Sequence, residues 1–274
     1  MRTLALMTFA VFCRPVIAQQ SSMSVFAESY RRPSLGIVGQ PSAEGGVDVA
    51  FCFHRDLPLS VGDVVKVVNA KKVATPADID AALPDTKKAV AVTYNVAMRK
   101  VARVVPKQLS ELLLDGVEQV KDNFGELPLV RHKLRETRKT SIDLRIVLDN
   151  DGPHPYLSAI CIGERWIGLD NLAIQFADRK EKKTLRFQLP LSSVTRKAQT
   201  DGVLEWGLLE MADKDLASLA AVSRSPIAIV RFDGRDGRKE IDLDVATQSR
   251  LLQMLMVHEM FRASKITNKS RLPL

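Results

Sequence analysis

The amino-acid sequence predicts a mainly β protein with some α-helix: a small, partly open barrel followed by a β-sandwich or α+β domain. One observation is the valine run that begins at Val64, directly after Gly62-Asp63, because β-branched residues favour strands and Gly-Asp favours a turn. Another is a series of apolar runs between residues 142 and 211, separated by polar turns. With 274 residues, 46% of them hydrophobic, the chain is long enough to form two cores.

The first 18 residues have the layout of a secretory signal peptide. A basic residue precedes the apolar run Leu4–Phe12, and Val16 and Ala18 stand at positions −3 and −1 of a cleavage site. The run is shorter than the ~20 residues that a membrane-spanning helix needs. We therefore expect a secreted or periplasmic protein that begins at Gln19 after cleavage. The alternative is a buried N-terminal strand or helix.

Residues 28–108 are predicted to form the first domain, in which three strands, a short helix and a hairpin follow one another. Thr75 is a good N-cap and Pro76 suits the first helical turn, so a helix is expected from there to Leu83. The other predicted strands of this domain are Leu35–Val38, Gly46–Phe51, Ala89–Tyr94 and Arg99–Val105.

Over residues 30–107 this pattern resembles a PDZ domain, of the type found in bacterial HtrA-like proteases and other exported proteins. Three motifs carry the resemblance: the entry loop Ser34-Leu35-Gly36-Ile37, the Gly-Asp strand Leu59–Val65 and the turn Val68–Val73. The helix that starts at Pro76 stands where the family has its groove helix. Ala70 departs from the family pattern, which has glycine at this turn position.

The resemblance implies that an extended peptide adds to the sheet as an antiparallel strand beside Ile37 and Val38. The C-terminal carboxylate of that peptide would accept hydrogen bonds from the backbone amides of Leu35, Gly36 and Ile37. Glycine at position 36 would let the anion come close to the backbone.

The resemblance also implies a pocket for the last side chain of the peptide. Ile37, Ile79 and Leu83 would line it, and Arg32 or its neighbour Arg31 would add positive charge near the carboxylate. For Ile79 and Leu83 the alternative is plain core packing. For the two arginines it is a pair exposed to solvent.

Residues 109–140 are predicted as a helical and basic linker. Leucine and valine recur every three to four residues between Gln108 and Asn123, which favours a helix. The stretch Arg131–Lys139 is basic, and the chain has a net charge of +8, so a weak contact with a polyanion is one interpretation. The other is a solvated strand or linker. Nucleic acid is not expected as a partner, since only 5% of the residues are aromatic and able to stack on bases.

Residues 141–264 are predicted as a β-rich domain with a closing helix, followed by a tail over 265–274. Its strand-like runs are IDLRIVL, YLSAICIG, LAIQFAD, TLRFQLPL and VLEWGLLEM. A helix over Asp213–Val222, a hairpin over Ile227–Asp244 and a final helix over Val245–Arg262 come next. The segment from Ile229 to Leu255 is similar to the end of exported bacterial β-domains, a similarity that implies no activity.

The sequence contains no Gly-x-Ser-x-Gly turn, phosphate-cradling loop or His-Glu-x-x-His helix, so we expect neither a metal nor a cofactor. Asp149, Asp151 and His154 are placed to hold a calcium ion weakly or to act in acid–base chemistry; the alternative is a polar hairpin turn. Cys52 and Cys161 either form a disulfide or remain buried free thiols.

These observations predict an exported, non-enzymatic interaction protein whose PDZ-like domain binds peptide C-termini or extended segments. The alternative is a hydrolase whose site lies in the C-terminal β-rich domain. The chain's own end, Ser270–Leu274, is basic and finishes in an apolar residue, so a further expected partner of the groove is this tail, from the same chain or a neighbour.

Overall fold

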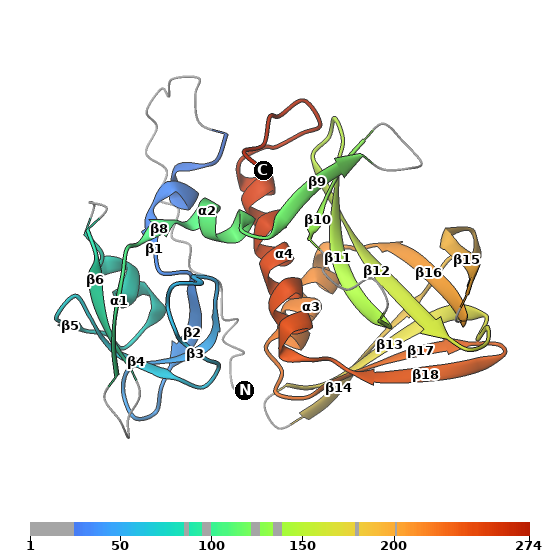
Figure 1. The fold of residues 1–274 in the computed structure, drawn as a ribbon, viewed down its shortest axis with the longest axis horizontal. Helices are drawn as coiled ribbons and strands as arrows, with labels where there is room; N and C mark the ends of the chain where they lie inside the picture. Colours follow the sequence, from blue (N-terminus) through green and yellow to red (C-terminus); the bar gives the residue numbers. More distant parts are fainter. Residues whose placement is uncertain are drawn as a thin grey trace, which may run out of the picture.

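The computed structural model describes residues 25–84, 88–94, 100–121, 127–133, 139–178, 181–200 and 202–274. Strands make up 46% and helices 21%, which confirms the mainly β fold class. Two units lie on either side of the long helix α4 (Val245–Ala263), as Figure 1 shows. No helix within these ranges is long and apolar enough to cross a membrane. The predicted signal peptide lies outside the described residues.

The first unit is an antiparallel sheet with one helix, in the predicted order. Its strands lie in the order β2-β3-β4-β6-β7, so β2 and β7 form the two edges. A short pair, β1 with β8, joins the two ends of the unit. The elements are η1 (Glu28–Arg31), β1 (Pro33–Ser34), β2 (Ile37–Pro41), β3 (Val47–Cys52), β4 (Val64–Val68), β5 (Lys71–Lys72), α1 (Pro76–Ala81), β6 (Val90–Tyr94), β7 (Lys100–Val104) and β8 (Lys107–Gln108).

The turns predicted around β4 are formed by residues with positive φ. Gly62 has φ +88°, and its amide donates to the carbonyl oxygen of Val49 at 2.9 Å. Asn69 and Ala70 follow β4 with φ of +48° and +63°. The Asn69 side chain donates to the carbonyl of Ala82 at 3.3 Å, which ties this turn to the end of α1. The local sequence therefore sets where β4 begins and ends.

We expect Ala70→Gly to raise the free energy of unfolding by up to about 1 kcal/mol. In the left-handed region the Cβ of alanine crowds the following carbonyl oxygen, and glycine removes that repulsion at some cost in unfolded-state entropy. Urea denaturation measures the change. The matched control is Ala77→Gly in α1, which is also exposed and should lose roughly 0.5–1 kcal/mol. An Ala70→Gly protein less stable than the wild type would contradict the expectation.

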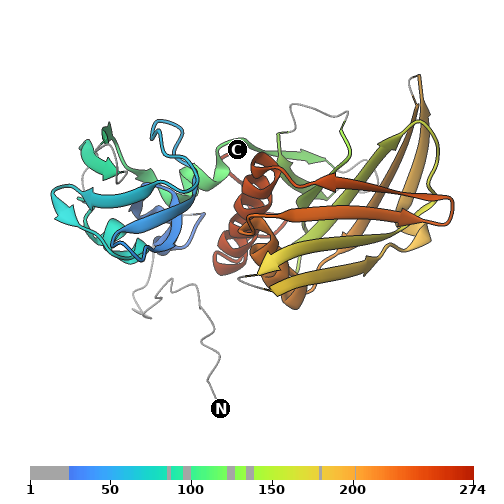
Figure 2. The ribbon, with the colours of Figure 1, turned by 90° about the horizontal axis from the view of Figure 1, so that it is seen from below.

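The second unit has two antiparallel sheets that share one apolar cluster with α3 and α4. Figure 2 shows both sheets extending away from α4. The six-stranded sheet is β15 (Val194–Gln199), β16 (Gly202–Glu210), β12 (Pro153–Gly163), β11 (Ser141–Leu148), β10 (Pro128–His132) and β9 (Val117–Lys121). The four-stranded sheet is β14 (Glu181–Gln188), β13 (Leu169–Asp178), β17 (Ala228–Gly234) and β18 (Gly237–Asp242). The helical elements are α2 (Leu109–Leu114), η2 (Leu191–Ser193), α3 (Asp213–Ser223) and α4.

The helix predicted between Gln108 and Asn123 is wrong beyond Leu114. Gly116 adopts φ +82° and ends the helical stretch, and the next residues form β9, which pairs with β10. Pairing with a distant strand outweighed the helical spacing of the apolar residues. Residues 117–121 and 128–132 therefore belong to the six-stranded sheet. The strand β15 was also missed, because it is largely exposed and lacks apolar alternation.

Helix α4 joins the two units in a common core. Phe51 and Phe53 of the first unit belong to the same apolar cluster as α4, and Phe26 stacks on Phe261 with 6.3 Å between ring centroids. The buried side chain of Gln253 donates to the carbonyl oxygens of Leu113 at 2.9 Å and Asp115 at 2.8 Å. Carbonyls at a helix end have no partner within the helix, so Gln253 satisfies the end of α2.

A buried carboxylate holds the loop that crosses between the two sheets. Glu205 of β16 is 1% exposed, and it accepts hydrogen bonds from the amides of Ile167 at 2.8 Å and Leu169 at 2.9 Å. Arg196 of β15 donates to the same carboxylate at 3.1 Å. Glu205 thereby fixes the start of β13 against β16.

A second buried carboxylate, Asp143, lies on β11 and is 2% exposed. Its Oδ1 accepts from the amide of Leu144 at 2.9 Å, while no donor among the residues described reaches Oδ2. Burial raises the pKa of Asp143 to about 6, against the lowering effect of the positive charges of Arg145, Arg250 and Arg131. The charged form of this side chain is therefore disfavoured by the fold.

Candidate functional site

Of the two edge strands of the first unit, β2 is the one at which the sequence analysis predicts the addition of another strand. Helix α1 packs beside β2, whose other neighbour is β3. The Gly36 carbonyl accepts from the amide of Phe53 at 2.8 Å, so Gly36 stands opposite Phe53 with one of the two bonds of a hydrogen-bonded pair, and Ile37 stands opposite Cys52. Because such pairs alternate along antiparallel strands, the N–H and C=O of the next residue, Ile37, point away from β3. The main chain at Ile37 is thus directed toward the open edge.

The entry loop before β2 is held by its own side chains. Leu35 is fully buried in the core of the first unit. Gly36 has φ +62°, and its amide donates to the Ser34 hydroxyl at 3.0 Å. Of the three amides that the resemblance assigns to a carboxylate, the amide of Gly36 therefore already has an acceptor.

Gly36 also lies where the entry loop packs on the next helix. A Cβ at this position would be 3.0 Å from Leu112 Cδ1 of α2 and 3.3 Å from the Cβ of Phe53. A larger residue would therefore strain both the left-handed backbone and this contact. Substitution of Gly36 is expected to disturb the fold as well as the loop.

The side chains predicted for the peptide pocket are divided between the core and the edge. Ile79 is 2% exposed and belongs to the core of the first unit, as the alternative of plain core packing predicts. Ile37 and Leu83 are half-buried and pack against the same cluster. Val38 packs against the other cluster, which contains α2 and α4. Ile37 and Leu83 are therefore the apolar side chains at the edge that remain open to a ligand.

Arg32 is exposed near α1, whereas Arg31 is half-buried and donates from Nε to the carbonyl of Phe26 at 3.0 Å. Partial desolvation raises the pKa of Asp80 on α1, and the positive charge of Arg32 opposes that rise. Arg32 thus supplies positive charge next to α1, while the Arg31 side chain holds the N-terminal turn through its hydrogen bond to Phe26.

The cluster at Asp149 and His154 forms a polar hairpin turn between β11 and β12. Asp149 Oδ1 accepts from the amides of Asp151 at 2.7 Å and Gly152 at 2.9 Å. The Nε2 of His154 lies 3.0 Å from Asp149 Oδ2, and its Nδ1 lies 3.3 Å from Glu210 Oε1. Both ring nitrogens face carboxylates, so neither is directed at a nucleophile. Across the described ranges, no group of three or more His, Cys, Asp or Glu side chains is arranged to hold a metal ion.

The two described cysteines are free thiols, so the disulfide alternative is wrong. Cys161 is 3% exposed, and burial raises its pKa to about 11. Burial also raises the pKa of the Cys52 thiol. Thiols in this state are poor nucleophiles, because the reactive species is the thiolate.

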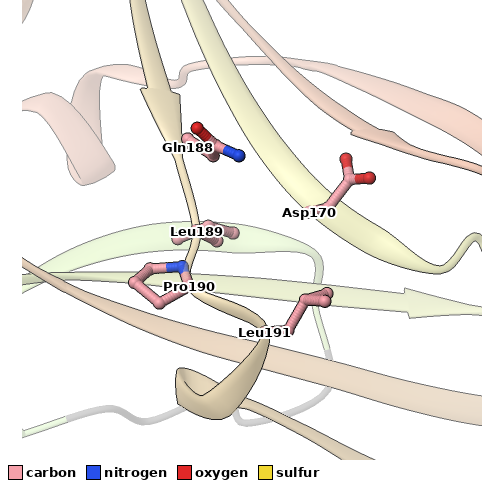
Figure 3. Close-up of a pocket in the computed structure, with 5 residues that line it drawn as sticks. All are labelled: Asp170, Gln188, Leu189, Pro190 and Leu191. Carbon is pink, nitrogen blue, oxygen red and sulfur yellow. The ribbon is translucent and has the colours of Figure 1, made fainter.

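One shallow cleft of about 290 Å³ lies where β13 begins, opposite the chain that leaves β14. Figure 3 shows Asp170 across from the segment Gln188–Leu191. Asp170 is the one ionisable residue among the five that line it.

The C-terminal tail lies beside β9 rather than beside β2 of its own chain. Leu272 and Leu274 line a cleft of about 470 Å³ together with residues 117–121 of β9, and Figure 1 shows the C-terminus near that strand. Ile266 is 2% exposed and anchors the start of the tail, and Leu272 packs against the cluster shared with α4. In this chain the tail thus contacts β9; its binding to the β2 edge of a neighbouring chain stays a prediction.

Sequence reasoning missed a cleft of about 780 Å³ at the junction of the two units, near Arg55, Gly116, His132 and Arg250. These residues come from separate segments, so only the basic character of residues 131–139 pointed toward it. Comparisons with family models, curated proteins and solved structures found no match to this chain. The candidate sites therefore rest on their geometry.

Proposed function

We propose that this chain is an exported, non-enzymatic adaptor that binds peptide C-termini or extended segments along β2. The observation that carries the proposal is the main chain of Ile37, whose N–H and C=O point to an open sheet edge beside α1. An added strand satisfies such groups with its own amides and carbonyls, which is the basis of β-augmentation.

The side chains around this edge suit a peptide that ends in an apolar residue with a free carboxylate. Alternate side chains of an added strand point to the same face, so every second one can contact Ile37 and Leu83. Arg32 provides positive charge at the end of the strand where the carboxylate would lie. Main-chain hydrogen bonds net only about 1 kcal/mol each, so these side-chain contacts decide which peptides bind.

The proposal is tested by panning a library of peptide C-termini against the full chain and scanning the best binder by backbone N-methylation. In an added strand, alternate amides face β2, so methylation should weaken binding at every second position by roughly tenfold or more and leave the positions between unchanged. Loss of affinity without this period of two would contradict strand addition.

The role of the charge is tested with Arg32→Ala against Arg103→Ala. Both arginines are exposed, but Arg103 lies on β7 at the opposite edge of the sheet. Only Arg32→Ala should weaken binding, and a C-terminally amidated peptide should lose this difference. Equal effects of the two substitutions would mean that the carboxylate does not bind at this end of β2.

A further inference from the structure

The cleft at the junction of the two units has the size and position of a small-molecule site. It measures about 780 Å³. Its walls come from the loop after β3, the turn between α2 and β9, the end of β10, the start of β11, the end of β18 with the segment that follows it, and the first two turns of α4. Ligand sites commonly have volumes of about 300–1,000 Å³ and lie where structural units meet. The cleft is independent of the β2 edge.

Because Gly116 has no side chain, two polar side chains can approach the same space in the cleft. A Cβ at Gly116 would lie 3.1 Å from His132 Nε2 and 3.3 Å from a terminal nitrogen of Arg55. With φ +82°, this position also favours glycine for its backbone. The missing side chain therefore lets an imidazole and a guanidinium group converge on the same place.

The Nε2 atom of His132 presents a lone pair to the space beside Gly116. Its Nδ1 lies 3.1 Å from the carbonyl oxygen of Lys133, so in the neutral ring Nδ1 carries the proton and Nε2 is an acceptor. Burial lowers the pKa of His132, and the charges of Arg250 and Arg55 lower it further, against the raising effects of the Lys133 carbonyl and Asp115. At neutral pH an acceptor nitrogen thus stands among positive charges.

Three carboxylates, Asp115, Asp242 and Asp244, line the cleft together with the cations Arg55, Lys133, Lys139 and Arg250. Asp115 lies 2.7 Å from Arg55, but both side chains are more than 40% exposed, so this ion pair is weak and leaves Arg55 able to bind another anion. Asp244 accepts from the amide of Thr247 as the N-cap of α4. Arg250 is positioned by a hydrogen bond of 2.8 Å from its terminal nitrogen to the Thr247 hydroxyl.

We propose that this cleft binds a phosphate group, as free phosphate or as part of a small phosphorylated molecule, between Arg55, His132 and Arg250. Phosphate fits this set because its oxygens accept hydrogen bonds from guanidinium groups, while its P–OH donates to the lone pair on His132 Nε2. The second pKa of a phosphate ester is about 6, so the shared proton can also pass to the imidazole. When the proton passes, the bound monoanion and the neutral ring become a dianion and an imidazolium ion.

The test follows the ring proton signals of the four histidines by NMR while inorganic phosphate is added to the full chain at constant ionic strength. The signal assigned to His132 by a His132→Gln variant should shift saturably, and the pKa of His132 should rise when phosphate is bound. Saturable binding that leaves His132 unshifted would overturn the proposal. Repeating the titration with ribose 5-phosphate decides the source: tighter binding indicates a phosphorylated molecule, and equal binding indicates phosphate itself.

Arg55→Ala should weaken phosphate binding by roughly tenfold, the size of one lost charge-assisted hydrogen bond. Arg55 is 64% exposed, so the substitution is expected to leave the fold intact. Arg262→Ala is the matched control, because Arg262 is an exposed cation at the far end of α4 that pairs with Asp213. Equal affinities of the two variants would show that phosphate associates with the basic surface in general and would overturn the site.

Discussion

Asp143→Asn is expected to raise the free energy of unfolding at pH 7 by as much as about 3 kcal/mol, which corresponds to a pKa that burial raises from 3.8 to about 6. The folded wild-type chain must carry this charge in a buried position, whereas the unfolded chain carries it in water. Asparagine avoids that penalty, and its side-chain oxygen can still accept from the amide of Leu144.

The effect depends on pH in a defined direction. Because the folded pKa of Asp143 lies above the unfolded one, the folded state binds more protons between pH 3.8 and about 6, and wild-type stability falls as the pH rises through this window. Below pH 3.8 the carboxyl group is protonated in both states, so Asp143→Asn and wild type should be alike. The difference should grow up to pH 6 and stay constant above it.

Urea denaturation of both proteins at pH 4, 5, 6 and 7 measures this dependence. Asp151→Asn makes the same chemical change at an exposed turn position and should stay within about 0.5 kcal/mol of the wild type. A difference for Asp143→Asn that is the same at pH 4 and pH 7 would show that packing, and not charge burial, is responsible.

Glu205→Ala should lower the free energy of unfolding by about 3–5 kcal/mol. The substitution leaves the amides of Ile167 and Leu169 without their acceptor and removes the carboxylate that pairs with Arg196. These groups lie between the two sheets, where solvent replaces the lost partner poorly.

The matched control is Glu210→Ala on the same strand. Glu210 is 59% exposed and contacts His154 at 3.3 Å, so its removal should cost less than about 1 kcal/mol. Urea denaturation at pH 7 compares the two variants. Glu205→Ala and Glu210→Ala proteins of equal stability would mean that the crossing loop does not depend on the buried carboxylate.

The parts of the fold that were predicted correctly depend on local chemistry. Gly62 and Asn69 turn the chain at either end of β4, and Thr75 caps α1 with Asp78 in a capping box. Their effects reach only a few residues along the chain, so the sequence displays them directly. The prediction missed β9 because the leucines before Gly116 obscured the change from helix to strand. The partner strand β10 follows only after a break in the apolar pattern of the sequence.

The candidate sites were predictable to different degrees. The resemblance placed Ile37 beside α1, but it did not reveal that the Gly36 amide is bonded to Ser34 or that Ile79 is buried. The junction cleft was not predictable, because Arg55, His132 and Arg250 come together only through the packing of α4 against both units.

The position of α4 also sets the order in which the protein can complete its folding. A ribosome produces the chain from its N-terminus, so Phe26, Phe51 and Phe53 are made long before Phe261, on which Phe26 stacks. Until residues 245–263 are synthesised, these aromatic rings lack the helix that buries them, and the end of α2 lacks Gln253. The first unit is thus synthesised first, but its aromatic side chains are buried only after the last helix has formed.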